Sequence, residues 1–281
     1  MERIAIISDI HGNLEALKTV LEDIKKRNIT RIFCLGDIIG KGSHPHECIA
    51  LVKELCEVVL IGNNDDVFTF NKAKFPMGEI DLKRLEWNRS LLTEEDMEYL
   101  TNLPYSFEFY MSGSLIRFFH ASPDKIAGFC ASYNLIDEKY KMFLPSKNTL
   151  SDNKADVVIF GHCHTTYVEK LFNRTLINVG SVGDNVCIIR SDARDANPKE
   201  ITRASYLILE GEYGSQEYKS SFSYNFIDIP YDIDSELKNI KQNFESDAYI
   251  NELKEGKYRD MTRVGKLLKE YNINIDEFKD A

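Results

Sequence analysis

Histidine is concentrated in a set of short motifs that also includes aspartate and asparagine, and the side chains of these motifs could bind metal ions. Four of the six histidines lie in these motifs. In chain order the motifs are Asp9-Ile10-His11, Gly36-Asp37, Gly62-Asn63-Asn64-Asp65, Phe119-His120-Ala121 and Gly161-His162-Cys163-His164. Imidazole nitrogens combined with carboxylate and amide oxygens suit borderline divalent metals, and pairs of such ions support hydrolytic chemistry. The pattern therefore predicts a metal centre.

Taken one at a time, most of these motifs are ambiguous. Asp9 could cap a helix, and His120, a single histidine at a strand end, could be structural. The pair His162 and His164 is the strongest local signal, because packing does not readily explain two imidazoles two residues apart after an apolar strand. All five motifs follow apolar runs. Because chance would rarely place five such motifs at strand ends, their joint occurrence favours a shared metal site.

Each motif follows an apolar segment that we expect to be a β-strand. The first such segments are residues 3–8, 31–35 and 58–61. Apolar residues at helical spacing predict helices over residues 13–27 and 45–55. Strands that alternate with helices form parallel sheets with right-handed crossovers, and sites collect beyond the carboxyl ends of their strands. The motifs lie at these ends.

The rest of the chain is expected to add strands and a helical tail. Further strands are predicted at residues 106–110, 115–120, 156–160, 167–171, 175–179, 206–209 and 223–229. Helical segments are predicted at 66–104, within 124–154 and from 232 to about 271. We expect a catalytic core over residues 1–190, with the helical insert at about 66–104, and C-terminal strands and helices over 191–281 packed on it. These helices could cover the site or only brace the sheet.

Composition limits the classes of partner and the compartment. The chain has 281 residues and a formal net charge of −10, so its mean field does not attract nucleic acid or anionic membranes. An anionic substrate would need a local positive centre, which bound metal would supply. The first apolar run is too short for a signal peptide, and no run approaches a membrane span. The six cysteines show no pairing pattern, and we expect reduced thiols in a cytoplasmic protein.

The ordered motifs resemble those of the calcineurin-like metallophosphoesterase superfamily, which are Asp-x-His, Gly-Asp, Gly-Asn, His and Gly-His-x-His. The resemblance covers residues 4 to about 185 and includes Asn178-Val179-Gly180-Ser181, which is similar to the family's Asn-Pro-Gly-Ser turn. It implies an α/β fold, here an α+β sandwich. Two mixed β-sheets pack against each other and helices flank them, which gives four layers. The metal site is then expected at the strand ends.

The resemblance also implies how the ligands divide between two divalent ions. One ion would take Asp9, His11, Asp37 and His164, and the other would take Asp37, Asn63, His120 and His162, with Asp37 bridging. These ligands suit Mn²⁺, with Fe²⁺, Zn²⁺ or Ni²⁺ as alternatives. Asp37, Asn63, Asn64 and His120 are the expected catalytic residues, in a reaction in which a metal-activated hydroxide attacks phosphorus.

Asn64 departs from the family pattern. Many relatives have a histidine directly after the ligand asparagine, where it protonates the leaving oxygen. Asn64 can donate a hydrogen bond but cannot deliver a proton, and a missing general acid costs about 10²- to 10⁴-fold when the leaving group needs one. The substitution favours activated phosphodiesters or phosphoanhydrides over alkyl phosphomonoesters. The layout of the motifs, including this substitution, is similar to that of the small bacterial phosphodiesterase branch. The long segment after the site resembles that of bacterial enzymes that hydrolyse dinucleoside polyphosphates.

Asn13, Lys41 and Asn64 are the candidate substrate-binding residues. Asn13 opens the first predicted helix, so its alternative role is that of a helix N-cap. Lys41 follows Asp37 in a glycine-containing loop, where it could meet a phosphate or simply be solvated.

We therefore expect a dinuclear-metal phosphohydrolase acting on a small phosphorylated substrate, with nucleotides among the candidates. A narrower alternative is a dinucleoside polyphosphate hydrolase. An alternative of another class is a non-catalytic metal-binding scaffold, which is disfavoured because none of the seven ligand positions is replaced. No stable nucleic-acid or membrane partner is expected.

Overall fold

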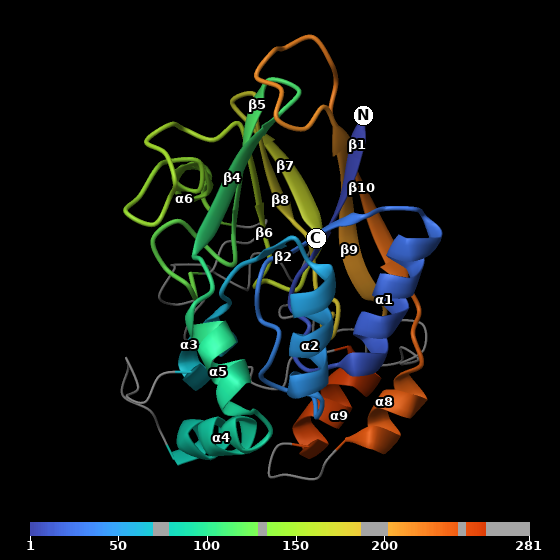
Figure 1. The fold of residues 1–281 in the computed structure, drawn as a ribbon. Coiled ribbons are helices and arrows are strands. Elements are labelled where there is room, and N and C mark those ends of the chain that lie inside the picture. Colours follow the sequence, from blue (N-terminus) through green and yellow to red (C-terminus); the bar gives the residue numbers. More distant parts are fainter. Residues whose placement is uncertain (70–78, 129–133, 187–201, 241–245, 257–281) are drawn as a thin grey trace, which may run out of the picture.

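The computed structural model describes residues 1–69, 79–128, 134–186, 202–240 and 246–256. Within them the chain forms two five-stranded sheets, ordered β10-β9-β1-β2-β3 and β4-β5-β6-β8-β7 (Figure 1). The strands of the first sheet are β1 (Glu2–Ile7), β2 (Arg31–Cys34), β3 (Val58–Val59), β9 (Ala204–Gly211) and β10 (Ser223–Ile229). Those of the second are β4 (Ser106–Met111), β5 (Ser114–Phe119), β6 (Val157–Phe160), β7 (Tyr167–Leu171) and β8 (Arg174–Asn178).

Both sheets are mixed, and the strands that carry the motifs run parallel within each sheet. β2 pairs parallel with β1 and with β3, whereas β9 and β10 add antiparallel strands at the other side of β1. In the second sheet β5, β6 and β8 are parallel, and β4 and β7 are antiparallel edges. The carboxyl ends of the parallel strands of each sheet therefore lie at one edge.

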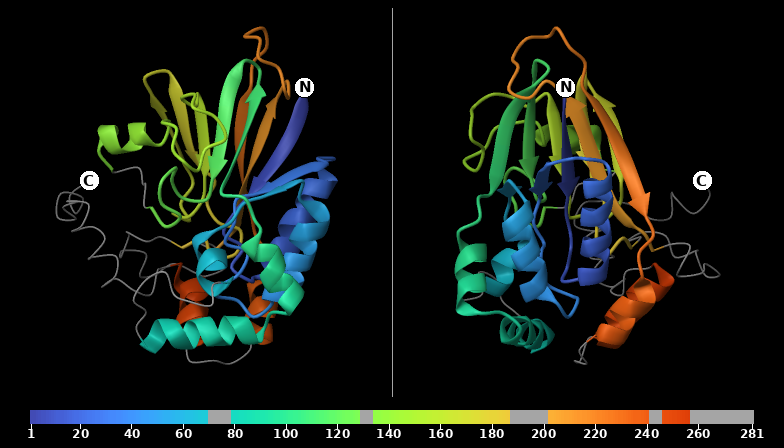
Figure 2. Two further views of the ribbon diagram at one scale, coloured as in Figure 1. Left: turned by 60° about the vertical axis from the view of Figure 1, so that its left-hand side comes forward. Right: turned by 45° about the vertical axis from the view of Figure 1, so that its right-hand side comes forward.

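Helices join these strands and cover their outer faces. The helices are α1 (Leu14–Lys26), α2 (Pro45–Leu55), α3 (Asn63–Thr69), α4 (Glu79–Ser90), α5 (Glu94–Thr101), α6 (Ile136–Lys141), α8 (Ile233–Asn239) and α9 (Ser246–Glu255). Figure 2 shows α1 and α2 against the first sheet, while α6 lies on the side of the second sheet. No helix among the described residues is both long and apolar enough to cross a bilayer.

Strand β1 shows why the sheets stack as they do. Its side chains alternate between two apolar layers, with Ile4 and Ile6 in the core between the sheets and Ala5 and Ile7 in the core under α1 and α2. A strand buried on both faces needs a continuous apolar sequence, which is what residues 4–7 provide. The four-layer fold of two packed mixed sheets flanked by helices, expected from the resemblance, is confirmed.

Several predicted elements differ in extent from the structure. β3 is two residues long, and α3 begins at Asn63 instead of residue 66, so the third motif opens a helix directly. Within 124–154 the described residues form only the short helix α6. The predicted tail helix is broken into α8 and α9, and residues 257–271 lie outside the described part. The domain division near residue 190 stays a prediction, although β9 and β10 complete the first sheet.

The cysteines in the described part are Cys34, Cys48, Cys56 and Cys163, and all four are free. Cys130 and Cys187 lie outside the described residues.

Candidate metal centre

Six side chains from both sheets form two adjacent groups at the strand ends. In the described part of the chain, one group consists of Asp9, His11 and His164 and the other of Asp37, His120 and His162. Within each group the potential ligand atoms all lie within 4.8 Å of one another. Asn63 joins the second group, because its Oδ1 lies 3.0 Å from His120 Nε2. The division matches the ligand sets expected from the resemblance.

Asp37 lies between the two groups. Its Oδ2 is 3.8 Å from His11 Nε2 in the first group and 3.5 Å from His120 Nε2 in the second. The side chain is buried, so its negative charge is not screened by solvent. This is the position from which one carboxylate could serve two ions, as expected from the sequence.

The backbone of the ligand loops is strained. Asp9, His11, Asp37, His162 and His164 have positive φ values of 55°, 55°, 53°, 65° and 56°. Left-handed conformations are uncommon for residues other than glycine, and they persist where the surrounding structure imposes them, often at functional sites. Five of the seven predicted ligands share this feature, which supports a functional reason for their conformation.

Two glycines let the ligand loops approach one another closely. A Cβ atom on Gly62 would lie 2.1 Å from the backbone nitrogen of Asp37, and one on Gly161 would lie 2.1 Å from Ser8 Oγ. Neither position can accept a side chain without moving a neighbouring ligand loop. Close approach of the ligand loops therefore requires glycine at both positions.

Hydrogen bonds at Nδ1 orient two of the imidazoles. His120 donates from Nδ1 to the carbonyl oxygen of Leu35 at 2.9 Å, and His164 donates from Nδ1 to that of Asp184 at 2.6 Å. Both rings therefore point Nε2 at the site, which is the arrangement in which a neutral histidine can bind a metal. His120 belongs to the second sheet and Leu35 to the first, so this bond also joins the sheets.

Burial and the neighbouring charges shift the pKa values of the four histidines in opposite directions. Burial lowers the pKa of His120, but the negative charges of Asp37 and Asp9 outweigh it and raise the pKa to about 9. Burial also lowers the pKa of His164, but Asp9 and Asp184 outweigh this effect and raise the pKa to about 10. For His11 and His162 burial and neighbouring imidazoles dominate, so their pKa values fall to about 4 and about 3.

The carboxylates themselves are held ionised by these imidazoles. Burial raises the pKa of Asp9, yet His120 and His164 bring it down to about 2. The pKa of Asp37 is held further below its usual range, because His120 and His11 again outweigh burial. The site therefore concentrates negative charge that cations would stabilise.

The donor set fits divalent metal ions. Asp9 Oδ1 is buried and faces two imidazoles of its own group, with His164 Nε2 at 3.3 Å and His11 Nε2 at 3.8 Å. The Nε2 atoms of His11 and His164 face one another at 3.0 Å. Cations bound by these oxygen and nitrogen atoms would satisfy them, with neutral imidazole and ionised carboxylate as the binding forms.

Asn64 points at Asp37. Its backbone N–H donates to Asp37 Oδ1 at 2.8 Å and its side-chain Nδ2 donates to Asp37 Oδ2 at 2.5 Å. The side chain therefore orients the carboxylate that lies between the two groups. Its expected contact with substrate stays a prediction.

Asn13 has a structural role in this arrangement. Its Oδ1 accepts a hydrogen bond from the Ala16 N–H, which confirms the N-cap interpretation. Its Nδ2 donates to the Gly183 carbonyl at 2.9 Å and to the Tyr231 hydroxyl at 3.2 Å. The side chain is fully buried, so the substrate contact considered from the sequence is not supported.

Lys41 also differs from its expected position. The side chain is only 9% exposed, and Nζ pairs with Asp184 Oδ2 and, at 3.2 Å, with Glu252 Oε2. An ammonium enclosed by two carboxylates is not a solvated loop lysine, and this geometry does not favour the predicted phosphate contact.

Sequence reasoning missed Asp184 and Asp65 as supporting residues. Asp184 holds His164 and Lys41, while the fully buried Asp65 carboxylate accepts hydrogen bonds from the N–H groups of Ile38 and Gly62, both at 3.0 Å. Burial and the charge of Asp37 raise the pKa of Asp65 to about 7. Asp65 adjoins the third motif and Asp184 follows the Gly180-Ser181 turn, but no spacing rule distinguished either from a loop carboxylate.

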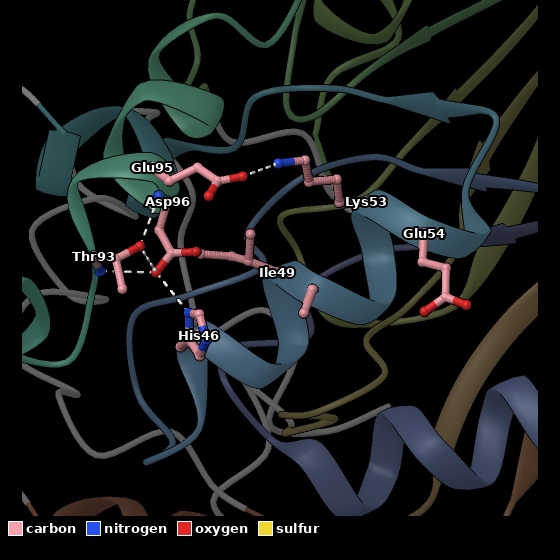
Figure 3. A pocket seen from close by; sticks show the side chains of 8 residues that line it. His46, Ile49, Lys53, Glu54, Thr93, Glu95 and Asp96 are labelled. Atoms are coloured by element: carbon pink, nitrogen blue, oxygen red, sulfur yellow. Dashed lines mark hydrogen bonds and ion pairs between the residues drawn. The ribbon is translucent and has the colours of Figure 1, made fainter.

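A hollow between α2 and α5 lies apart from this centre. Its volume is about 290 Å³, and its lining includes His46, Lys53, Thr93, Glu95 and Asp96 (Figure 3). His46 donates to Asp96 Oδ2 at 2.8 Å, and Lys53 pairs with Glu95 at 2.6 Å. The side chain of His46 is 52% exposed. No metal ligand lines this hollow.

Comparisons with known proteins agree with this geometry. The model of the calcineurin-like phosphoesterase superfamily domain matches residues 2–196. An uncharacterized protein of Methanocaldococcus jannaschii is 29% identical over 243 residues, which cover 85% of this chain and 92% of that protein.

Two crystal structures share the fold. A metallophosphoesterase from Sphaerobacter thermophilus has 23% identity and a TM-score of 0.63, over 91% of this chain and 99% of that one. A hypothetical protein from Pyrococcus horikoshii has 18% identity and a TM-score of 0.69, over 92% and 100% of the two chains.

Proposed function

This chain belongs to the calcineurin-like phosphoesterase superfamily, and we propose that it is a dinuclear-metal phosphohydrolase that cleaves phosphodiester or phosphoanhydride bonds. The observation that carries the proposal is the pair of adjacent donor groups with Asp37 between them. Two ions bound there would supply Lewis acidity and an activated water nucleophile at neutral pH. The proposed ligands are Asp9, His11, Asp37, Asn63, His120, His162 and His164.

The side chains of the site prepare it for this chemistry before substrate arrives. Hydrogen bonds at Nδ1 fix the rings of His120 and His164, and Asn64 fixes the carboxylate of Asp37. Because these side chains are already oriented, the site has to reorganise less during the reaction. Metal binding requires neutral imidazoles beside ionised Asp9 and Asp37, so the bound cations must also provide the attraction for an anionic phosphate.

Asn64 favours substrates whose leaving group does not need a proton. Its amide donates both to the protein and, in principle, to a substrate oxygen, but it carries no proton that it can transfer at neutral pH. Leaving groups that depart as stable anions, such as aryl oxides and nucleotide phosphates, tolerate this, whereas alkyl alcohols do not. We therefore propose activated phosphodiesters or phosphoanhydrides as substrates, with Mn²⁺ as the first metal to test.

The test compares three substrates on Mn²⁺-loaded protein: bis-p-nitrophenyl phosphate, p-nitrophenyl phosphate and diadenosine tetraphosphate. Turnover of the diester or the tetraphosphate well above the monoester is expected. Chromatography of the nucleotide products decides whether the narrower dinucleoside polyphosphate activity is present. No turnover of any substrate, with two metals bound per chain, would contradict the proposal and favour a metal-binding scaffold.

A further inference from the structure

The C-terminal helices lie close to the proposed metal centre. In Figures 1 and 2, α8 and α9 lie beneath the N-terminal ends of α1 and α2, beyond the segment that the family model matches. Helix α9 buries Tyr249 and Leu253 in a small apolar cluster with α8. It also buries Glu252 completely, although a buried carboxylate is costly unless it is paired. Glu252 therefore requires a partner that compensates its buried charge.

Glu252 is linked to the centre through Lys41 and Asp184. Its Oε2 lies 3.2 Å from Lys41 Nζ, which also pairs with Asp184 Oδ2. Asp184 and Glu252 are fully buried, and Lys41 is 9% exposed. These charges come from the loop after β2, the turn after β8 and helix α9, so the interaction joins three distant segments. Two carboxylates around one ammonium leave a net negative charge beside the centre.

Asp184 connects this charge cluster to His164. The carbonyl oxygen of Asp184 accepts the Nδ1 hydrogen bond of His164 at 2.6 Å, and its Oδ2 lies 3.2 Å from the same nitrogen. The opposite nitrogen, Nε2, lies 3.3 Å from Asp9 Oδ1 and 3.0 Å from His11 Nε2. The partner at Nδ1 thus decides which nitrogen faces the donor group.

A second path ties the same turn to Asp9. The N–H of Asp184 donates to Ser181 Oγ at 2.8 Å, and Ser181 Oγ donates to the Asp9 carbonyl at 2.7 Å. The Gly183 N–H donates to that carbonyl as well, at 3.0 Å. A displacement of Asp184 would therefore disturb two of the three side chains of the first donor group.

We propose that Glu252, Lys41 and Asp184 form a positioning chain that holds His164 as a metal ligand, so that helix α9 is part of the metal centre. The proposal rests on the proposed function, because it requires metal at that group. Loss of a partner that orients a ligand histidine lowers metal affinity by about 10- to 100-fold. Lys41 then acts within the protein, and its positive charge is not available to a phosphate.

The test uses the full-length chain stripped of metal and titrated with Co²⁺, whose absorption spectrum reports ligand geometry as well as binding. The wild-type chain is expected to bind two equivalents of Co²⁺. Asp184→Asn keeps the backbone carbonyl that accepts from His164 Nδ1 but removes the carboxylate charge beside that nitrogen and the ion pair with Lys41. It should weaken one equivalent by up to about 10-fold and change its spectrum. Glu252→Gln, which keeps the side-chain shape, should weaken the same equivalent by less. Lys41→Arg, which keeps the charge, should restore most of the affinity lost in Lys41→Met.

Glu169→Gln is the matched control. It removes another lysine–glutamate pair, Lys139 to Glu169 at 2.7 Å, at the edge strand β7. Both Co²⁺ affinities should stay at the wild-type values in this variant. Thermal unfolding of each metal-free variant separates a loss of stability from a loss of binding. If Glu252→Gln does not fold, the comparison of Lys41→Arg with Lys41→Met still decides the question.

Two results would overturn the positioning chain. One is lower stability of Asp184→Asn and Glu252→Gln with both Co²⁺ affinities and spectra unchanged. The other is a higher KM for a phosphodiester in Lys41→Met with unchanged Co²⁺ binding, which would assign Lys41 to the phosphate. A wild-type chain that binds Co²⁺ but hydrolyses nothing contradicts the proposed function alone, whereas one that binds no Co²⁺ overturns both.

Discussion

The interactions of Asp37 show how one side chain can determine a centre built from two sheets. Its carboxylate faces His11 on one side and His120 on the other, and Asn64 donates to both of its oxygens. The opposing effects of burial and imidazole charge leave its pKa far below the usual range, so it is ionised throughout the accessible pH range. An ionised carboxylate with two oxygens is what a bridging ligand requires.

Asp37→Ala should therefore affect both donor groups at once. We expect metal content to fall from two ions towards none and kcat/KM to fall at least about 100-fold, because an orienting or ligating partner is lost on both sides. Metal content by mass spectrometry and hydrolysis of bis-p-nitrophenyl phosphate measure the two effects. Near-normal turnover in this variant would rule out the dinuclear assignment.

Asn64→His tests the leaving-group argument at a single residue. An imidazole could deliver a proton, so activity on alkyl phosphomonoesters should rise more than activity on aryl phosphodiesters, within the range of about 10²- to 10⁴-fold attributed to general acids. Asn64→Ala is the control, because it removes the amide without adding an acid and should lower both activities. Equal changes on both substrates in Asn64→His would undercut the argument.

At the level of elements, helices α2 and α5 are joined by interactions outside the proposed centre. His46 of α2 donates to Asp96 of α5, and Asp96 also accepts hydrogen bonds from Thr93 in the capping box of α5 (Figure 3). The hydrogen bond and charge of Asp96 raise the pKa of His46 above its usual value of 6.5, against a smaller opposing effect of burial. This contact should make the docking of α5 depend on pH.

The sign of that dependence follows from the raised pKa of His46. The stabilisation is complete below about pH 6.5 and is lost as pH rises through the higher folded-state value. Urea unfolding of the wild type and His46→Gln should therefore differ most at about pH 5.5, and the difference should shrink once the pH exceeds the raised pKa of His46. Lys53→Gln removes the neighbouring pair with Glu95 and should shift stability equally across this pH range. A constant difference for His46→Gln would contradict the prediction.

At the scale of the whole molecule, the sandwich of two sheets brings ligands from separate sheets to one edge. Asp9 and Asp37 come from the first sheet, whereas His120, His162 and His164 come from the second. The histidines and carboxylates share protons in the absence of metal, since the pKa values of His120 and His164 rise to about 9 and about 10. Metal binding must displace these protons.

Metal uptake at pH 7 should thus release about two protons per chain, and affinity should increase as pH rises towards the pKa values of His120 and His164. Calorimetric titration with Mn²⁺ in buffers of different ionisation enthalpy measures the number released. Binding should also raise the melting temperature, because saturation at a thousandfold excess over Kd adds about 4 kcal/mol. Binding heats that do not depend on the buffer would contradict this account.

Much of the candidate site could be predicted from local sequence, because its components are defined over a few residues. Apolar runs predicted nearly all of the strands, and the motif residues at their ends include all members of the two donor groups. Parallel strands then require those ends to meet at one edge. For this reason residue type and order along the chain were sufficient to predict a metal centre, whereas the packing of two mixed sheets was expected only from the resemblance to the family.

The supporting interactions were decided only by the tertiary structure. The partners of Lys41 are separated from it by 143 and 211 residues, and Asn13 meets the hydroxyl of a tyrosine 218 residues away. No local pattern specifies which charges become buried together, because pairing depends on how segments far apart in the sequence pack against one another. The sequence determined which side chains could bind metal. Tertiary packing of the turn after β8 and of the C-terminal segment determined that Lys41 lies among carboxylates and that Asn13 is buried.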